Sequence, residues 1–503
     1  MQLLIRRSGN LIDVSPDGFS PLPLDCLNLL TPMMRYEHKT LLRGHQAYDA
    51  ASGQRSSISV ELRNLYALEQ GRLATGIGYI NAINAMLQRH GHEVHYLDLS
   101  PRRPRPDCYV PDWDNLLPHV EFRPRQQEAL MAIVNNEFGL IDACTGFGKT
   151  ELFKMIALLF PKARIHIVVK PKDVAARIVR QLSKVLPNVG MVGGGKSKTG
   201  RVTVYTADSL HRSDGDCDIL LCDEAHQLVA ETYIAELGRA YRFSRNFAFT
   251  ATPEGRMDGA CARLKMFFGD CIFQLTYQEG VALGLVVPIH VRWLPIRLQY
   301  NPAQDKTGTT RDRWGIWRND ERNAIIANDA RTTYDADTQV LVLCATVDHA
   351  IHLWQHLQEF TLCYSGIDEE DFERYQKNHY IPGSFQRMTP QRRDAMRNDF
   401  EAGNLKKVIA TDVWATGVDF ARLQVVYRVD CRESEILDTQ AGGRPSRIFT
   451  GEDGVVKEYG EVVDCVDLFD KTLKRKAETR KRHYRKLGWS QDWPSGRRQI
   501  SYE

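Results

Sequence analysis

The sequence lacks the long apolar runs of a membrane protein. No stretch of the 503 residues approaches the roughly 18 apolar residues that a membrane span requires. The apolar start of the chain, residues 1–5, is too short for the core of a signal peptide, and Arg6 and Arg7 follow it directly. The sequence therefore predicts a cytoplasmic protein without a membrane partner.

Cysteine pairs with metal-binding spacing are also absent. The 11 cysteines are scattered, and no pair has Cys-x-x-Cys spacing, so we expect reduced thiols and no zinc site. The net charge of +3 excludes little, because it averages over regions of unlike charge. With 43% hydrophobic and 26% charged residues, the composition is that of ordinary globular domains. The length predicts roughly three such domains.

What is present is a stretch with the spacing of a phosphate-binding loop. Residues 143–150 read Ala-Cys-Thr-Gly-Phe-Gly-Lys-Thr. The apolar run 139–141 precedes this stretch, and a helix-like run, 151–160, follows it. A strand, a glycine-containing turn and a helix N-terminus are the parts of an anion-binding loop. A chance glycine-rich turn is the alternative, but matching motifs follow at suitable distances.

Each polar or glycine position of this loop has an expected part in nucleotide binding. Thr145, Gly146 and Gly148 form the turn whose backbone N–H groups would face the phosphates. Lys149 would reach the β- and γ-phosphates of ATP, and Thr150 would bind Mg²⁺.

A second strong signal is a pair of carboxylates at the end of an apolar strand. The run 218–222 leads into Asp223 and Glu224, within the sequence Asp-Glu-Ala-His. Asp223 can hold Mg²⁺ through water, and Glu224 can orient and deprotonate the attacking water. A further strand ends at 250–252, Thr-Ala-Thr, whose hydroxyls could link the nucleotide state to a nucleic-acid track.

Gln126 is the candidate for recognition of adenine. It lies 23 residues before Lys149, just ahead of an expected helix, and its amide both donates and accepts hydrogen bonds. Phe122 could cover the adenine ring. The alternative is that Arg-Pro-x-Gln is an ordinary helix start.

Three further polar residues follow expected buried strands of the first half. Lys170 and Lys172 come after the β-branched run 165–169, and Thr206 comes after 202–205. Ligands meet the carboxyl ends of strands in a doubly wound sheet, so these residues are candidates for nucleic-acid contact. A solvated loop is nearly as good an interpretation of the two lysines.

A second α/β unit begins near Thr338, with buried strands expected at 339–344, 407–410 and 425–429. Beyond them, Arg444 and Arg447 lie three residues apart on an expected helix start. Such arginines can neutralise charge on a γ-phosphate, although a structural pairing role for one of them stays open.

The two ends of the chain differ in character from the central part. Residues 1–105 alternate short strand and helix patterns, which predicts a small α+β accessory domain. The segment 101–106 reads as a stiff basic linker. The tail 471–486 holds nine Lys and Arg residues against one acid and is expected to be a helix that contacts nucleic acid, with Tyr484 and Trp489 as stacking surfaces. A solvated charged face is the alternative.

Taken together, these motifs resemble the ordered set of the superfamily 2 helicases of DEAD/DEAH-box type, over about residues 120–450. The small N-terminal domain and short tail look most like UvsW-type phage branch-migration and repair DNA helicases. The resemblance implies an α/β fold of two tandem RecA-like P-loop domains with ATP in the cleft between them. It also implies that Gln440, Arg444 and Arg447 reach across that cleft, one arginine acting as a finger.

The resemblance assigns further roles and bounds. Thr411 and Asp412 would lie near the nucleic-acid backbone, and Asp419 near the ribose. The cellular setting would be the cytoplasm of a bacterium or of a phage-infected host. The expected parts are an accessory domain at 1–105, a RecA-like domain at 106–285, a connector at 286–335, a second RecA-like domain at 336–465 and a basic helical tail at 466–503.

The sequence therefore predicts an ATP- and Mg²⁺-dependent DNA helicase or translocase that remodels forked or branched DNA. Its expected partner is single-stranded, forked or junction DNA. The alternatives are a duplex DNA translocase that does not separate strands, an RNA helicase with RNA as the partner and, least favoured, a non-enzymatic recombination scaffold. The sequence leaves the oligomeric state open.

Overall fold

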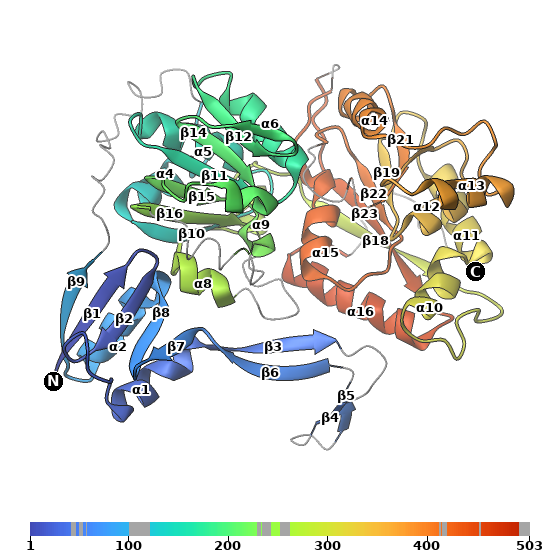
Figure 1. Cartoon of the computed structure of the whole chain (residues 1–503). Helices are drawn as coiled ribbons and strands as arrows, with labels where there is room; N and C mark the ends of the chain where they lie inside the picture. Colours follow the sequence, from blue (N-terminus) through green and yellow to red (C-terminus); the bar gives the residue numbers. More distant parts are fainter. Residues whose placement is uncertain are drawn as a thin grey trace. The chain divides into compact units, whose positions relative to one another are not determined.

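A computed structural model describes residues 1–41, 47–49, 54–56, 58–99, 121–228, 233, 243–251, 262–411, 414, 420–451 and 454–491. The chain folds into two compact units, Met1–Thr276 and Tyr277–Glu503 (Figure 1). Strand β18, Ile289–Ile296, and helix α11, Asp320–Thr333, lie in the range expected for a connector, and both belong to the second unit. The finer domain bounds stay a prediction.

The first unit begins with a small α+β domain. Its sheet has the order β7-β8-β2-β1-β9, in which β1 and β9 are parallel and the other neighbours antiparallel. A ribbon of β3 and β6 and a short pair, β4 and β5, extend from it. The bounds are β1 Gln2–Ser8, β2 Leu11–Ser15, α1 Leu24–Leu30, β3 Arg35–Leu41, β4 Ala47–Asp49, β5 Gln54–Ser56, β6 Ile58–Asn64, β7 Tyr66–Glu69, β8 Arg72–Gly76, α2 Ile80–Arg89 and β9 Glu93–Asp98.

This α+β domain packs closely on helix α8, Ala262–Phe268, of the same unit. At Gly78 a Cβ atom would come within 2.0 Å of the carbonyl oxygen of Lys265, so only glycine allows the two backbones to approach this closely. Arg263 donates a 2.7 Å hydrogen bond to the Tyr36 hydroxyl, and Arg7 pairs with Glu137 at 3.3 Å. The accessory domain is therefore fixed to α8.

The rest of the first unit is a doubly wound α/β domain. Its eight-stranded sheet has the order β13-β12-β14-β11-β15-β16-β10-β17, parallel except for the β12–β13 hairpin. The bounds are α4 Gln126–Asn135, β10 Phe138–Ala143, α5 Lys149–Leu159, β11 Ile165–Val169, α6 Lys172–Leu182, β12 Val189–Gly193, β13 Lys196–Lys198, β14 Val202–Thr206, β15 Ile219–Cys222, β16 Arg245–Thr250 and β17 Cys271–Leu275. Strands β10, β15 and β16 thus bring their carboxyl ends to one edge.

The second unit is built on a six-stranded parallel sheet with the order β18-β23-β22-β19-β21-β20. Beyond β18 and α11, its bounds are α9 Tyr277–Ala282, α10 Gly308–Asp312, β19 Val340–Leu343, α12 Val347–Trp354, β20 Thr361–Cys363, α13 Glu369–Lys377, α14 Pro390–Ala402, β21 Lys407–Ala410, β22 Val425–Arg428, α15 Glu435–Gly442, β23 Gly460–Asp467 and α16 Lys471–Lys486. Two parallel sheets in tandem confirm the predicted fold class.

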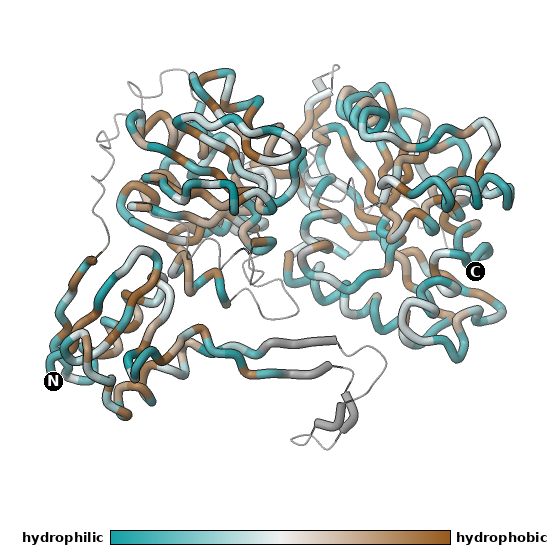
Figure 2. The backbone as a smooth tube through the Cα atoms, viewed as in Figure 1, coloured by the Kyte–Doolittle hydropathy of each residue, from teal (hydrophilic) through white to brown (hydrophobic). Residues whose placement is uncertain are grey.

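Hydrophobic residues concentrate in the strands of both sheets, as the tube coloured by hydropathy shows (Figure 2). Strand β11 is buried over its whole length, which explains its continuous run of apolar and β-branched residues. Among the helices that the structure describes, none is both long enough and apolar enough to cross a membrane.

The basic tail helix α16 is anchored by buried ion pairs. Arg480 and Asp464 are 1% and 0% exposed and make a two-pronged contact at 2.8 and 2.9 Å. The Tyr484 hydroxyl donates to the same carboxylate at 2.8 Å. One face of α16 is therefore part of the interior of the second unit.

Candidate active site

The phosphate-binding loop follows β10 and leads directly into α5. Gly146 and Gly148 have backbone φ angles of +99° and +88°, a region that glycine adopts without strain. Between them Phe147 is fully buried and stacks on Phe273 of β17, with ring centroids 5.3 Å apart. The Phe147–Phe273 contact thus anchors the middle of the loop on β17.

Gln126 holds this loop from the side. It is 1% exposed; its amide nitrogen donates to the carbonyl oxygen of Phe147 at 2.8 Å, and its amide oxygen accepts from the backbone N–H of Arg123 at 2.9 Å. The Arg123 guanidinium donates to the Gly146 carbonyl oxygen at 2.5 Å. Both ends of the Gln126 amide are therefore directed at the chain, and contact with adenine stays a prediction, as does the cover by half-buried Phe122.

Three charged groups converge at the ends of β10 and β15. Lys149 Nζ lies 3.4 Å from Glu224 Oε1, and the backbone N–H of Glu224 donates to Asp223 Oδ1 at 3.0 Å. Burial, and then the charge of Glu224, raises the pKa of Asp223 to about 6. Burial alone would lower the pKa of Lys149, but the two carboxylates outweigh it and raise that pKa.

Glu224 connects this cluster to β16. It has a left-handed backbone, with φ +46°, which is uncommon for a residue with a side chain. Its Oε2 lies 3.5 Å from His226 Nδ1, and the same His226 nitrogen lies 2.9 Å from Thr250 Oγ1. A continuous chain of polar contacts therefore runs from Lys149 to Thr250 across three neighbouring strand ends.

The candidate nucleic-acid residues of the first unit divide into two groups. Lys170 and Lys172 are exposed, one at the end of β11 and the other at the start of α6. Thr206 is 4% exposed, and its hydroxyl donates to Ser209 Oγ at 2.9 Å. Only the lysines present their side chains to solvent. Thr150 lies half-buried in the first turn of α5, and Thr145 half-buried within the loop.

The described candidates of the second unit differ in burial: Thr411 and Arg444 are buried, whereas Gln440 and Arg447 are half-buried. Thr411 is 3% exposed, and its hydroxyl accepts from the backbone N–H of Ser365 at 3.1 Å. Gln440 lies in α15. After that helix, Arg444, which is 6% exposed, begins a short 3₁₀ turn, Arg444–Ser446. Arg447 directly follows this turn. The two arginines were expected at a helix start, and Arg444 does begin the 3₁₀ turn.

Some predicted positions lie outside the described residues. These are Asp412, Asp419, Thr252 and the linker 101–106. Nothing in the structure bears on their predicted contacts with nucleotide or nucleic acid.

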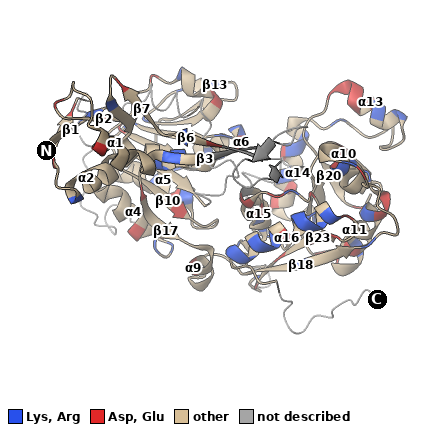
Figure 3. Ribbon diagram, turned by 90° about the horizontal axis from the view of Figure 1, so that it is seen from below, with Lys and Arg blue, Asp and Glu red and all other residues tan. Residues whose placement is uncertain are grey.

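The expectation that Tyr484 and Trp489 offer stacking surfaces was wrong. The two residues are 0% and 4% exposed and stack on each other with ring centroids 5.0 Å apart. Trp489 also packs so close to Gly442 that a Cβ there would meet its ring at 2.8 Å. The exposed Lys and Arg residues of α16 remain on its outer face (Figure 3).

Sequence reasoning missed the contacts that support the loop. Arg123, Phe147 and Phe273 were given no part, yet they fix the loop from the side and from below. His226 was likewise identified only as part of the Asp-Glu-Ala-His motif, and no contact was predicted for it. No spacing rule identifies such partners, because β17 lies more than 100 residues from the loop in sequence.

The loop geometry makes Gly148→Ala a sharp test. A Cβ at Gly148 would lie 2.8 Å from Gln126 Nε2 and would displace the hydrogen bond that holds Phe147. We expect ATP affinity to fall roughly tenfold or more, because the substitution removes a hydrogen bond and adds backbone strain of about 1–2 kcal/mol. Equilibrium binding of an ATP analogue measures this loss of affinity.

Gly195→Ala is the matched control for that substitution. Gly195 has φ +84°, but nothing lies within 4 Å of a Cβ there, so it shares the backbone strain without the contact. ATP affinity should stay unchanged. Equal losses in both variants would contradict the specific role of the Gln126 contact.

A phosphate-binding loop beside an Asp-Glu-Ala-His box at adjacent strand ends defines the first unit as a P-loop nucleoside triphosphatase. Two family models match the chain. "Type III restriction enzyme, res subunit" matches residues 119–255, and "Helicase conserved C-terminal domain" matches residues 325–449. The chain belongs to the superfamily 2 helicases. The matched models describe domains of helicase-type enzymes, which supports the predicted nucleic-acid-dependent ATPase.

Individual relatives are distant. The chain is 28% identical over 166 residues to "DNA 3'-5' translocase XPB2" of Sulfurisphaera tokodaii. This match covers 32% of the present chain and 37% of the translocase. The chain thus spans little more than a third of that curated relative.

Two solved structures match the chain at low sequence identity. S. cerevisiae Dbp5 bound to RNA and ADP BeF3 has a TM-score of 0.51 and 14% identity, covering 75% of this chain and 92% of that one. The match to the crystal structure of T4 UvsW covers 98% of this chain and 99% of the UvsW chain, with a TM-score of 0.40 and 15% identity.

Proposed function

We propose that this protein is an ATP-driven motor that remodels forked or branched DNA in recombination, repair or replication. The observation that carries the proposal is the chain of contacts from Lys149 through Glu224 and His226 to Thr250. It joins the phosphate-binding loop to β16, the strand that leads towards α8. Changes at the nucleotide could therefore reach the part of the unit on which the accessory domain is fixed.

In the proposed mechanism the Lys149–Glu224 ion pair is exchanged when ATP binds. Lys149 would contact the β- and γ-phosphates, which carry more negative charge than one carboxylate. Glu224 Oε1 would then be released to orient the attacking water and accept its proton. Gln440, Arg444 and Arg447 would lower the charge that develops on the γ-phosphate, and Gln126 with Phe122 would recognise adenine.

The donor set fits a magnesium ion. Asp223 is 7% exposed, and its raised pKa marks a carboxylate whose ionised form is poorly compensated by the protein alone. A cation held by Asp223 and the Thr150 hydroxyl would supply that compensation and would neutralise phosphate charge.

The contacts with nucleic acid are proposed from exposure and charge. Exposed Lys170 and Lys172 would meet backbone phosphates directly, and Thr411 and Asp412 would lie near the strand. Thr206 would contact the strand only after its hydrogen bond to Ser209 is exchanged. Phosphate contacts of this kind predict strong salt dependence and little sequence preference.

DNA rather than RNA is favoured by the DNA translocase among the curated relatives and by the accessory domain. A domain packed on α8 of the first unit can act against a branch point, because it would move with that unit. An RNA helicase is the second candidate, since the Dbp5 structure contains RNA. A duplex translocase without strand separation is the third.

The experiment compares ATP turnover with no nucleic acid, single-stranded DNA, forked DNA, a four-way junction and RNA, at two salt concentrations. We expect the largest stimulation with forks or junctions, and weaker stimulation at high salt. Strand displacement on a labelled fork separates a helicase from a duplex translocase. Stimulation by RNA alone would overturn the DNA assignment and leave the motor intact.

A further inference from the structure

An exposed surface lies where β18 and β23 end, at the carboxyl-terminal edge of the second sheet. The two strands are parallel and stay in register up to Ile296 and Asp467. The Leu468 N–H then donates to the Ile296 carbonyl oxygen at 2.9 Å, so the segments that follow the two strands begin side by side. Their exposed residues form what we call the strand-end surface: Arg297, Tyr300, Leu468, Lys471 and Lys474.

The segment that carries Tyr300 is fastened to the start of α16. Asp470 caps this helix, because its Oδ1 accepts from the backbone N–H groups of Thr472 and Leu473 at 2.9 and 3.0 Å. Its other oxygen accepts from the side-chain amide of Asn301 at 3.1 Å. Tyr300 is therefore the direct neighbour of a residue bound to the helix cap, yet it is itself 68% exposed.

The loop beyond Tyr300 is packed as well. The Ala303 N–H donates to Asn301 Oδ1 at 2.9 Å, and Ala303 is fully buried. Gly315 approaches it so closely that a Cβ there would lie 3.0 Å from the Ala303 side chain and 3.1 Å from that of Leu473. The aromatic ring of Tyr300 is thus presented to solvent by a backbone that is held on both sides.

Positive charge on the strand-end surface is not compensated by the protein. With the described residues, the side chains of Arg297, Lys471 and Lys474 make no ion pair or hydrogen bond. Two further cations near the start of α16 are paired with carboxylates, at 3.8 and 2.9 Å respectively: Arg475 with Glu433 and Lys476 with Asp312. The nearest carboxylate in sequence, Asp470, is 7% exposed and serves as the helix cap. The surface therefore combines one aromatic ring with three available cations.

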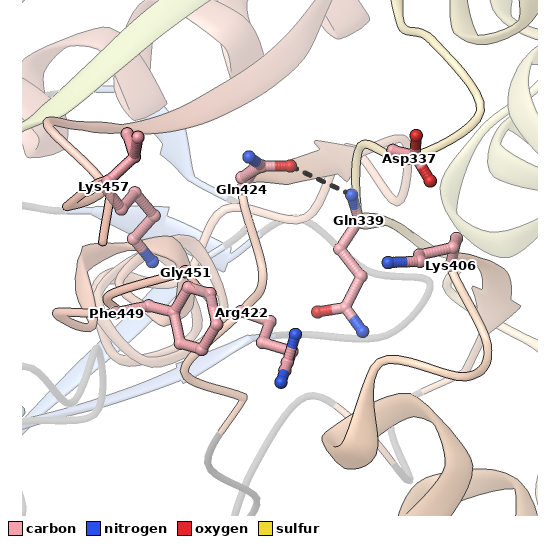
Figure 4. Close-up of a pocket in the computed structure, with 9 residues that line it drawn as sticks. Asp337, Gln339, Lys406, Arg422, Gln424, Phe449, Gly451 and Lys457 are labelled. Carbon is pink, nitrogen blue, oxygen red and sulfur yellow. Dashed lines mark hydrogen bonds between the residues drawn. The ribbon is translucent and has the colours of Figure 1, made fainter. Parts of the chain in front are cut away.

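The cations at the opposite, amino-terminal edge of the same sheet are engaged by the protein itself. A pocket of about 210 Å³ lies there, and its lining includes Gln339, Arg422, Phe449 and Lys457. The Lys457 ammonium donates to two backbone carbonyl oxygens, both at 3.0 Å, and the Arg422 guanidinium lies 4.6 Å from the Phe449 ring centroid (Figure 4). The strand-end surface differs from this pocket in that its cations face solvent.

We propose that the strand-end surface binds a single-stranded segment of nucleic acid, with Tyr300 stacked on an unpaired base and the three cations at backbone phosphates. This inference rests on the proposed function and adds a contact region for its substrate. A single strand matches both features of the surface, because every base offers a flat face to an aromatic ring and every phosphate offers a negative charge. An acidic protein segment would pair with the cations but would offer no flat group to Tyr300.

The position of the surface in the sheet is compatible with one continuous strand. Thr411, the candidate nucleic-acid residue after β21, lies at the same carboxyl-terminal edge. Three strand spacings separate β23 from β21, which is about 14 Å at the usual spacing between neighbouring strands. A strand a few nucleotides long that contacts Thr411 could therefore reach Tyr300.

The first test concerns stacking on Tyr300. Equilibrium binding to the full chain is measured with a short labelled DNA strand, an RNA strand of the same length and a strand of that length built from abasic nucleotides. Tyr300→Ala should weaken binding of the DNA strand about five- to a hundredfold, the range for one lost stacking contact. Tyr300→Phe keeps the ring and should bind within about twofold of the wild type. With the abasic strand, Tyr300→Ala should have no effect, because no base is present to stack.

The second test concerns the phosphate contacts. Lys471→Ala and Lys474→Ala should each weaken binding and reduce the steepness of log K against log salt concentration by about 0.7, the value for one phosphate contact on a single strand. Lys377→Ala is the matched control. That exposed lysine of α13 belongs to the same unit but lies outside the strand-end surface, so both the affinity and the slope should stay unchanged.

The outcomes separate this inference from the proposed function. Tighter binding of either the DNA or the RNA strand, weakened in the same variants, would support the inference and identify the strand. Unchanged binding in Tyr300→Ala and in both lysine variants would refute the inference and leave the motor intact, as would equal losses on the natural and abasic strands for the stacking role. If the variants weaken binding as expected but no nucleic acid stimulates ATP turnover, the proposed motor function fails and the surface remains a binding site.

Discussion

Replacing Glu224 with Gln is expected to reduce ATP turnover by about 10²–10⁴-fold, the usual contribution of a general base. Gln has nearly the same shape and fits the same backbone, but it cannot accept the proton of the attacking water. ATP binding should persist. Lys149 would lose the Glu224 carboxylate 3.4 Å away as an ionic partner, but it could still contact the phosphates. Turnover at saturating nucleic acid and equilibrium binding of an ATP analogue measure the two effects separately.

Two controls define the meaning of that result. Glu128→Gln makes the same change at a 57% exposed residue of α4 that pairs with Arg125, and turnover should stay within twofold of the wild type. Lys149→Ala should instead weaken nucleotide binding by roughly ten- to a hundredfold, the effect of losing a charge-assisted hydrogen bond to phosphate. Near-normal turnover by Glu224→Gln would mean that another residue is the base.

The second large effect is expected from Asp464→Ala in the second unit. This change leaves Arg480, 1% exposed, without its two-pronged partner, and it removes the acceptor of the Tyr484 hydroxyl. Breaking a buried ion pair from one side destabilises by about 3–5 kcal/mol. Because Trp113 is the only one of the 8 tryptophans that precedes residue 276, tryptophan fluorescence during urea unfolding reports mainly on this unit.

An exposed ion pair provides the control for this stability change. Arg331 and Glu359 are 48% and 45% exposed, and Glu359→Ala should change the unfolding free energy by no more than about 1 kcal/mol. The double variant Asp464→Leu with Arg480→Met should be less destabilised than Asp464→Ala, because no charge is then left buried alone. A small effect of Asp464→Ala would show that α16 is not anchored by this pair.

The buried strands of both sheets were predictable because their patterns are local. The run 165–169 became β11 and the run 407–410 became β21, each with the expected bounds. Continuous β-branched and apolar residues have no good alternative to a strand buried on both faces. Strands β18 and β23 were not predicted, although they pair with each other over eight positions, since their alternating and acidic residues resemble those of an exposed segment.

The charged residues of the candidate site were predictable for a similar reason. A phosphate-binding loop needs its glycines and lysine at fixed spacing, and a strand that ends on two carboxylates is equally local. The sequence alone therefore determined that Lys149, Asp223 and Glu224 belong to one site. The contacts that hold Gln126 and Phe147 in place were not accessible, because they depend on the approach of distant strands.

The sequence by itself determined the class of this protein: a superfamily 2 helicase with two parallel α/β sheets and a candidate ATPase site at strand ends. Only the tertiary structure decided that Arg480 and Tyr484 of the basic tail are interior residues, and that Gln339, Arg422 and Phe449 form one pocket. Local patterns specify strands, turns and the chemistry at strand ends. Burial and pairing of a charged residue depend on which distant segment comes to face it, and that is set by packing.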